Sequence, residues 1–159
     1  MISKITFPKS IFDNSKSCIY VICIDNKKYY VGITGSKNAQ GEFISSPFKR
    51  LSKHFVYTNS NKTFSIFKNN HEIDLKNSEI DFYYFTFDNL SQKKLNKEDE
   101  KKLYKNGEKY LINLFKINYD LVSLNSDLNL NIDKKCFSEE DEKSLVEFFD
   151  YITEIQLHF

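Results

Sequence analysis

The stretch SCIYVICIDNKKYYVGIT, residues 17–34, decides the fold of this 159-residue chain. Its first half, residues 17–25, is rich in Ile, Val and Tyr and is apolar at both alternating positions, which predicts a strand buried on both faces. A short polar connection around Asn26 and Lys27 leads to a second strand over residues 28–34. Because the connection is so short, the two strands should form an antiparallel hairpin.

The rest of the chain predicts helices around one further strand. In chain order these elements are a helix that starts at Ser46 and Pro47, a short helix over 63–70, a strand over 79–88, a long helix over about 96–116, and a last helix over 138–157. Ser46 can cap the first helix, Asn96 can cap the long helix, and Ser138 with Asp141 forms a capping box for the last one.

This order of elements predicts an α+β fold, with a small, mainly antiparallel three-stranded sheet flanked by helices and an extra C-terminal helix. Fifteen Phe and ten Tyr provide enough apolar surface for a sizeable core. No repeat or low-complexity linker divides the chain. We expect residues 1–132 to form the main domain and residues 133–159 to form an acidic helical extension packed on it. This acidic extension could also cover the basic part of the chain or form a dimer seam.

Composition excludes several classes of protein. No apolar run approaches the roughly twenty residues that a membrane span needs. The N-terminus lacks the apolar region of a secretion signal. The three Cys residues have neither zinc-ligand spacing nor an even count, which suits a reducing compartment. We therefore expect a cytoplasmic protein that does not contact a membrane.

Net charge is only +1, yet the charge is unevenly distributed along the chain. Residues 1–62 hold ten basic and three acidic side chains, residues 63–132 hold ten and eleven, and residues 133–159 hold three and eight. Of the 23 Lys and Arg residues, Arg50 alone is an arginine. The basic N-terminal part of the chain is therefore the part expected to meet an anionic partner such as nucleic acid.

Four sequence features follow one another in a set order: Cys18-Ile19-Tyr20, Tyr30-Val31-Gly32, Arg50 with His54 four residues later, and Glu108. In this order they resemble the GIY-YIG endonuclease family, which carries G-I-Y and Y-I-G motifs on a hairpin, an Arg on the first helix and a Glu on a later one. The resemblance covers about residues 17–125. It departs from the family pattern at Cys18, which replaces the first Gly, at Val31, which replaces Ile, and around residues 37–46, where an insertion is indicated.

The resemblance implies a role for each motif residue. Tyr20 would be the general base, acting through its phenolate, and Tyr30 would position water or phosphate. Arg50 would bind phosphate through its guanidinium fork. His54 lies one helical turn after Arg50 and would relay a proton or hold the phenol. Glu108 would be the only carboxylate ligand of Mg²⁺, or of another divalent cation, with water and phosphate as the other ligands.

Two of these implied roles carry conditions. An ordinary Tyr has a pKa of about 10, so Tyr20 would need nearby positive charge to lower its pKa before it could act as a base near neutrality. The family also has an Asn after the Glu. We assign it to Asn125, and Asn118 and Asp120 are rival positions.

Plain structural interpretations compete with these roles. Tyr is common in hairpins as a packing residue. Tyr20 and Tyr30 are ten residues apart, so they share a face of the hairpin only if its loop has an odd length, such as three residues. Glu108 lies along the apolar stripe of the long helix, and the plain alternative is that it only flanks the stripe and pairs with a Lys. Gly107 beside it weakens the helix, which indicates either a close approach of another backbone or a ligand, or chance.

We therefore expect a metal-dependent endonuclease that hydrolyses phosphodiester bonds in double-stranded DNA. The side chains expected to neutralise phosphates are Lys27, Lys28, Lys49, Arg50 and Lys53. No separate DNA-reading module is visible, so sequence specificity would come from loops such as 35–46, from residues 59–77, or from a homodimer.

Two other functions stay open. One is a non-catalytic nucleic-acid-binding protein that keeps the GIY-YIG-like fold and has lost hydrolysis, as the Cys18 replacement would suit. The other is an interaction or structural α+β protein in which the hairpin match is accidental.

Overall fold

Seven parts of the chain are described by the computed structural model: residues 8–12, 17–34, 46–55, 77–87, 95–118, 122–125 and 131–157. The elements are η1 (Lys9–Phe12), β1 (Cys18–Ile24), β2 (Lys28–Thr34), α1 (Pro47–Phe55), β3 (Ile80–Phe85), α3 (Lys97–Asn118), β4 (Val122–Ser123), η2 (Lys134–Cys136) and α4 (Glu139–Leu157), where η marks a 3₁₀ helix. The predicted helix over 63–70 and almost all of the loops 35–46 and 59–77 lie outside the described residues.

The hairpin of β1 and β2 forms as the sequence predicts. Ile24 pairs with Lys28, so the loop has three residues, an odd number. The main-chain N–H of Lys27 donates to the carbonyl of Ile24 at 3.0 Å. Asp25 and Asn26 have φ values of 52° and 50°, the left-handed conformation that Asp and Asn tolerate better than other side chains do. This turn fixes the register of the two strands.

Three antiparallel strands in the order β3-β1-β2 make up most of the sheet, which confirms the predicted α+β fold. Asp25 helps to place β3, because its carboxylate accepts hydrogen bonds from the Ser78 hydroxyl and the Glu79 main-chain N–H, both at 2.8 Å. The two-residue strand β4 adds to β2 in parallel and was not predicted from the sequence.

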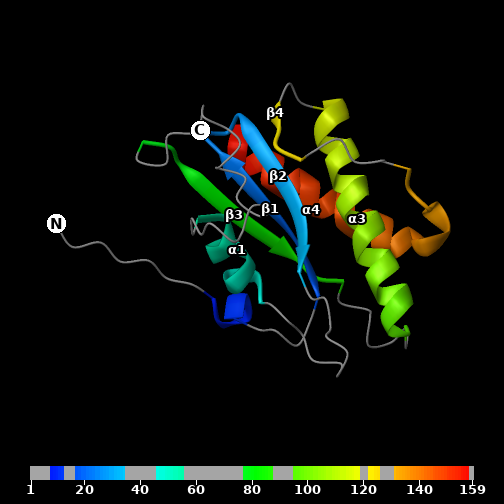
Figure 1. Ribbon diagram of the computed structural model, residues 1–159. Helices are drawn as coiled ribbons and strands as arrows, with labels where there is room; N and C mark the ends of the chain where they lie inside the picture. The colour runs from blue at the N-terminus through cyan, green and yellow to red at the C-terminus, as the bar shows by residue number, and fades with distance from the viewer. Residues whose placement is uncertain are drawn as a thin grey trace.

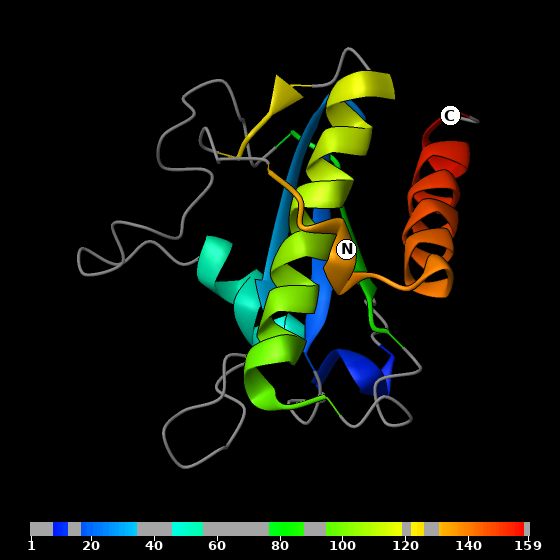
Figure 2. The same ribbon diagram turned by 90° about the vertical axis from the view of Figure 1, so that its right-hand side faces the viewer.

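The two faces of the sheet pack against different helices. Alternate residues of β1, Ile19, Val21 and Cys23, are buried with α3 and α4, whereas Tyr20 and Ile22 are buried toward Leu51 of α1. Figure 1 shows the sheet with α1 in front of it and α4 behind it. Figure 2 shows α1 and α4 on opposite sides of the sheet, with α3 running along β2. The central strand β1 therefore belongs to two separate cores.

Helix α4 is amphipathic, and Leu145, Phe149 and Ile152 are buried in the core that it shares with α3. This core lies on the face of the sheet opposite α1, so the expectation that the acidic segment could cover the basic part of the chain is wrong where that part includes α1. Apolar burial decides its position, because three large side chains outweigh a screened surface charge. None of the helices described is long and apolar enough to cross a membrane.

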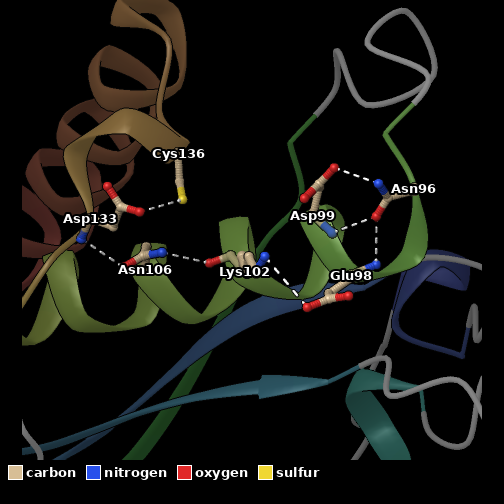
Figure 3. Close-up of polar contacts among 7 residues, drawn as sticks. All are labelled: Asn96, Glu98, Asp99, Lys102, Asn106, Asp133 and Cys136. Carbon is tan, nitrogen blue, oxygen red and sulfur yellow. Dashed lines mark hydrogen bonds and ion pairs between the residues drawn. The ribbon is translucent and has the colours of Figure 1, made fainter.

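Side-chain caps begin the helices where the sequence predicts them. The Asn96 side-chain oxygen accepts from the main-chain N–H groups of Glu98 and Asp99 at 3.0 and 2.9 Å (Figure 3). Figure 3 also shows a contact of Asp133 with α3, because the Asn106 side-chain oxygen accepts from the main-chain N–H of Asp133 at 3.0 Å. The capping box of α4 forms as well: the Ser138 main-chain N–H donates to the Asp141 carboxylate at 2.8 Å, and the Asp141 N–H donates to the Ser138 hydroxyl at 3.2 Å.

Candidate functional site

Tyr20 and Tyr30 lie on the same face of the hairpin, because the loop between them has three residues. Their ring centroids are 6.1 Å apart. His54 of α1 lies over this face, with its Nε2 2.8 Å from the Tyr20 hydroxyl oxygen and its ring centroid 5.0 Å from that of Tyr30. Tyr20 is 0% exposed and His54 is 1% exposed. The three side chains form one buried cluster between β1, β2 and α1.

Arg50 and Glu108 lie near this cluster. Arg50 lies one turn before His54 on α1, which begins at Ser46 with a hydrogen bond from the Lys49 main-chain N–H to the Ser46 hydroxyl. Its positive charge lowers the pKa values of Tyr20, Tyr30 and Glu108, although burial outweighs it in each case. Glu108 in turn adds to the rise in the pKa of Tyr30. Such mutual effects require the charged groups to be near one another.

Glu108 is a carboxylate with a strongly perturbed pKa. Desolvation by burial raises the pKa to about 7 from an ordinary value of 4.5, against the positive charges of Lys105, Arg50 and Lys109. Tyr104, Leu111 and Phe115 on the same stripe of α3 are buried in the core. Glu108 is therefore a titratable side chain on an otherwise apolar stripe of α3.

Tyr20 does not have the lowered pKa that a phenolate base needs. Burial raises its pKa well above 10, and the adjacent Tyr30 raises it further, while the charge and hydrogen bonding of Arg50 lower it by less. The sequence indicated a nearby cation, Arg50, but it does not show how deeply Tyr20 is buried. In the chain alone Tyr20 is a protonated phenol.

Gly32 makes room for Tyr20. The two residues are directly paired across β1 and β2, and a Cβ at position 32 would lie 2.5 Å from both Cζ and the hydroxyl oxygen of Tyr20. The Tyr20 ring therefore lies across the Gly32 backbone. On its other side it stacks on Phe82 of β3, with ring centroids 5.6 Å apart.

The substitution Gly32→Ala should lower the free energy of unfolding by about 1–3 kcal/mol, the usual cost of overpacking a buried site. The new methyl group would push the Tyr20 ring against Phe82 and away from His54. Urea unfolding measures the loss. In a double-mutant cycle with Tyr20→Leu, which lacks the clashing atoms, Gly32→Ala should cost much less. Equal costs in both backgrounds would show that the clash with Tyr20 is not the cause.

Gly107 has a comparable function on α3. A Cβ at this position would lie 2.6 Å from Cδ1 of Ile19 on β1 and 3.4 Å from Cζ of Phe87. The neighbour is thus a core side chain rather than a ligand or another backbone. Because Gly107 lets α3 lie close to the sheet, Glu108 comes near Tyr30 and the charge of Arg50.

Asn125 is bound to the backbone of β2. Its side-chain oxygen accepts from the Val31 N–H at 3.0 Å, and its side-chain nitrogen donates to the Val31 carbonyl at 2.7 Å. The amide thus continues the pairing that β4 makes with Lys28 and Tyr29. In these contacts Asn125 acts on the Y-V-G segment as a positioning residue. The side chain of the rival Asn118, and all of Asp120, lie outside the described residues.

Asn125→Ala should lower the free energy of unfolding by about 1–3 kcal/mol, because it leaves a donor and an acceptor of Val31 without their partners. Asn125→Asp should keep protection of the Val31 amide against hydrogen exchange, since a carboxylate still accepts, and should lose the bond to the carbonyl. Native-state hydrogen exchange with urea unfolding checks both variants. Unchanged protection of the Val31 amide in Asn125→Ala would show that the hydrogen bonds of Asn125 do not hold the Val31 backbone.

Cys18, the residue in place of the family's first Gly, is buried and inert. Its thiol lies 3.2 Å from the Thr34 hydroxyl oxygen, and burial raises its pKa to about 11 in spite of that contact. The side chain therefore fits the end of the hairpin without adding a reactive group.

The expected phosphate-binding residues lie on α1 and at the turn end of the hairpin. Lys49 is exposed beside Arg50 on α1, whereas Lys27 and Lys28 lie at the turn end of the hairpin. Lys28 is two residues from Tyr30 on the same face of β2, about 7 Å along an extended strand. The side chain of Lys53 is outside the described residues. Two lysines of α3, Lys105 and Lys109, affect Glu108 and were missed, because residues 63–132 are balanced in charge overall.

The donor set restricts which metal the cluster could hold. Within the described ranges there is no group of three or more His, Cys, Asp and Glu side chains arranged for a metal ion. Glu108 is the carboxylate near the cluster. Its pKa is raised because the nearby positive charges do not fully offset the cost of burying its negative charge. A cation that takes one carboxylate and otherwise water and phosphate, as Mg²⁺ does, fits this set, whereas structural zinc, which needs four protein ligands, does not.

Comparison of the chain with models of protein families, with curated proteins and with solved structures found no match.

Proposed function

We propose that the protein is a metal-dependent endonuclease of the GIY-YIG type that hydrolyses phosphodiester bonds, with double-stranded DNA as its substrate. One observation supports this above the others. Tyr20, Tyr30, Arg50, His54 and Glu108 come from four elements spread over 89 positions of the sequence, yet Tyr20, Tyr30 and His54 are in contact, and Arg50 and Glu108 are near enough to affect the pKa of Tyr30. A set of packing residues has no need of an arginine, a histidine and a high-pKa carboxylate together.

Each side chain has a role that follows from its contacts. Arg50 binds the reacting phosphate, because its fork carries a permanent charge and donates two parallel hydrogen bonds. His54, in the tautomer with its proton on Nδ1, accepts the hydrogen bond of the Tyr20 hydroxyl at Nε2 and can take its proton. Tyr20 then acts as the base toward water, with Arg50 stabilising the phenolate charge. Tyr30 orients the water or the phosphate.

Glu108 would hold the divalent cation, which supplies Lewis-acid stabilisation of charge on the phosphoryl oxygens. The same carboxylate, when protonated, cannot serve as a ligand. Since its pKa is about 7, the chain binds the cation in competition with a proton near neutral pH. Mg²⁺ in excess would shift that balance toward the ionised carboxylate.

Incubation of supercoiled plasmid with the full chain tests this proposal. Nicked or linear product in Mg²⁺, and none in excess EDTA, is the expected result. DNA binding measured in parallel by fluorescence anisotropy separates the alternatives. Binding without cleavage would overturn the enzyme and favour a binding protein, and neither binding nor cleavage would overturn both.

A second candidate function is a non-catalytic nucleic-acid-binding protein with the same fold. The observation that favours it is the state of Tyr20, which is fully buried with a raised pKa and is therefore far from a reactive phenolate. Arg50 and the basic residues of α1 would still bind phosphate in such a protein.

A cytoplasmic location is part of the proposal and is supported by three free cysteines, two of them buried. A homodimer, as one candidate source of sequence specificity, stays a prediction, as does recognition of a target sequence through the loops.

A further inference from the structure

Helix α3 carries lysines that the predicted basic surface did not include, among them Lys101, Lys102, Lys105 and Lys109. Two of them have partners, because Lys102 lies 3.5 Å from the Glu98 carboxylate and Lys109 donates to the Asn131 carbonyl at 3.0 Å. Lys105 is exposed, and within the part of the chain that the structure describes it has neither a hydrogen bond nor an ion pair.

Lys105 lies beside the candidate site. It precedes Glu108 by three residues, so the two side chains are neighbours on the surface of α3, about 60° apart around the helix axis. Its charge lowers the pKa of the Glu108 carboxyl more than the charge of Arg50 does. Glu108 therefore has nearby cations from two helices, Lys105 from α3 and Arg50 from α1. Figure 2 shows that α1 and α3 are separate elements beside the β2 strand, so this pair is not local to one helix.

We propose that Lys105 is a substrate-binding residue, which contacts a backbone phosphate next to the one held by Arg50. This inference rests on the proposed function and names a contact of the same site. A lysine suits a neighbouring phosphate, because its ammonium is a point charge on a flexible stem that needs no fixed geometry. It also offsets the repulsion between the Glu108 carboxylate and the approaching nucleic-acid backbone. The substrate would then run across the cluster from α1 to the exposed side of α3.

The matched variants Lys105→Gln and Lys143→Gln remove the same charge from different helices. Lys143 belongs to α4, which packs on the face of the sheet opposite α1, and its exposed ammonium lies 3.7 Å from the Glu147 carboxylate. The probe is a short DNA duplex of mixed sequence in EDTA, with the binding constant measured over a series of salt concentrations. For Lys105→Gln the slope of log K against log salt should become shallower by about 0.9, the value for one lost phosphate contact. Lys143→Gln should keep the wild-type slope and affinity.

The outcomes separate the two proposals. If the wild type does not bind the duplex, the proposed function and this inference both fail. If the wild type binds and Lys105→Gln keeps both affinity and slope, the contact of Lys105 with phosphate is wrong and the proposed function stands. With cleavage in Mg²⁺, Lys105→Gln should raise KM several-fold with little change in kcat, because Lys105 binds substrate away from the reacting atoms. An equal loss in both variants would show a general charge effect and would also overturn the inference.

Discussion

Glu108→Gln should abolish Mg²⁺-dependent cleavage and at the same time stabilise the protein at alkaline pH. Loss of cleavage follows if Glu108 is the carboxylate that holds the cation, because an amide oxygen carries no charge. Stabilisation follows from the raised pKa of Glu108, about 7 in the folded chain against an ordinary value of 4.5. Between these values the folded state binds a proton that the unfolded state has lost, so stability falls as pH rises. Above the higher pKa the full penalty is about 3 kcal/mol, and Gln does not incur it.

Urea unfolding at pH 5 and pH 8 measures this difference in the free energy of unfolding between the variant and the wild type. The difference should grow in favour of Glu108→Gln as the pH rises, and the two proteins should differ least at the acid end. A constant difference would mean that Glu108 titrates normally. At pH 7, added Mg²⁺ should raise the unfolding midpoint of the wild type and leave that of Glu108→Gln unchanged, since a ligand stabilises only the state that binds it.

Tyr20→Phe should reduce cleavage by about 10²–10⁴-fold, the usual contribution of a general base. The Phe ring can keep its stacking on Phe82, so the fold should survive. The free energy of unfolding should fall by about 1–3 kcal/mol, because the buried Nε2 of His54 loses the Tyr20 hydroxyl. A quenched cleavage assay and urea unfolding measure the two effects separately.

Tyr84→Phe is the matched control for Tyr20→Phe. Tyr84 is paired with Tyr20 across β1 and β3, faces the same side of the sheet, and has its hydroxyl hydrogen-bonded to the Ser10 hydroxyl. The Tyr84→Phe substitution removes one phenol oxygen and leaves the contacts of His54 and Arg50 unchanged. Cleavage by Tyr84→Phe should stay near that of the wild type. If Tyr20→Phe cleaves as well as this control does, the phenol of Tyr20 is not the base.

The strands and helices could be predicted where the pattern of side chains is local and strong. The strand over 28–34 has the same bounds in the structure, and the caps at Asn96 and Ser138 form as expected. Strand β4 could not be predicted in this way. Its two residues pair with Lys28 and Tyr29, and the neighbouring Asn125 continues the pairing, so its position depends on contacts about ninety residues apart rather than on propensity.

The sequence predicted which residues make up the candidate site, but it did not predict their pKa values or the nearby charge of Lys105. The order of the motifs identified Tyr20, Arg50 and Glu108, and the odd loop was a condition that the structure meets. Burial is a property of the folded chain, and it reverses the direction expected for the pKa of Tyr20. Lys105 was missed for a related reason. Averaging charge over a segment hides a single cation that the helix brings to one carboxylate.

The three-residue turn between β1 and β2 also limits how this hairpin can change in evolution. Because side chains alternate along a strand, inserting or deleting one residue at Asp25–Lys27 would move Tyr30 to the other face, among the residues that pack on α3 and α4, if the turn kept three residues and the pairing of the strands shifted instead. A shift of two residues would keep both tyrosines on the α1 side. With a three-residue turn, the spacing between Tyr20 and Tyr30 can therefore change only in steps of two. Any odd change has to be absorbed as a longer or shorter turn if the two tyrosines are to stay together on one face.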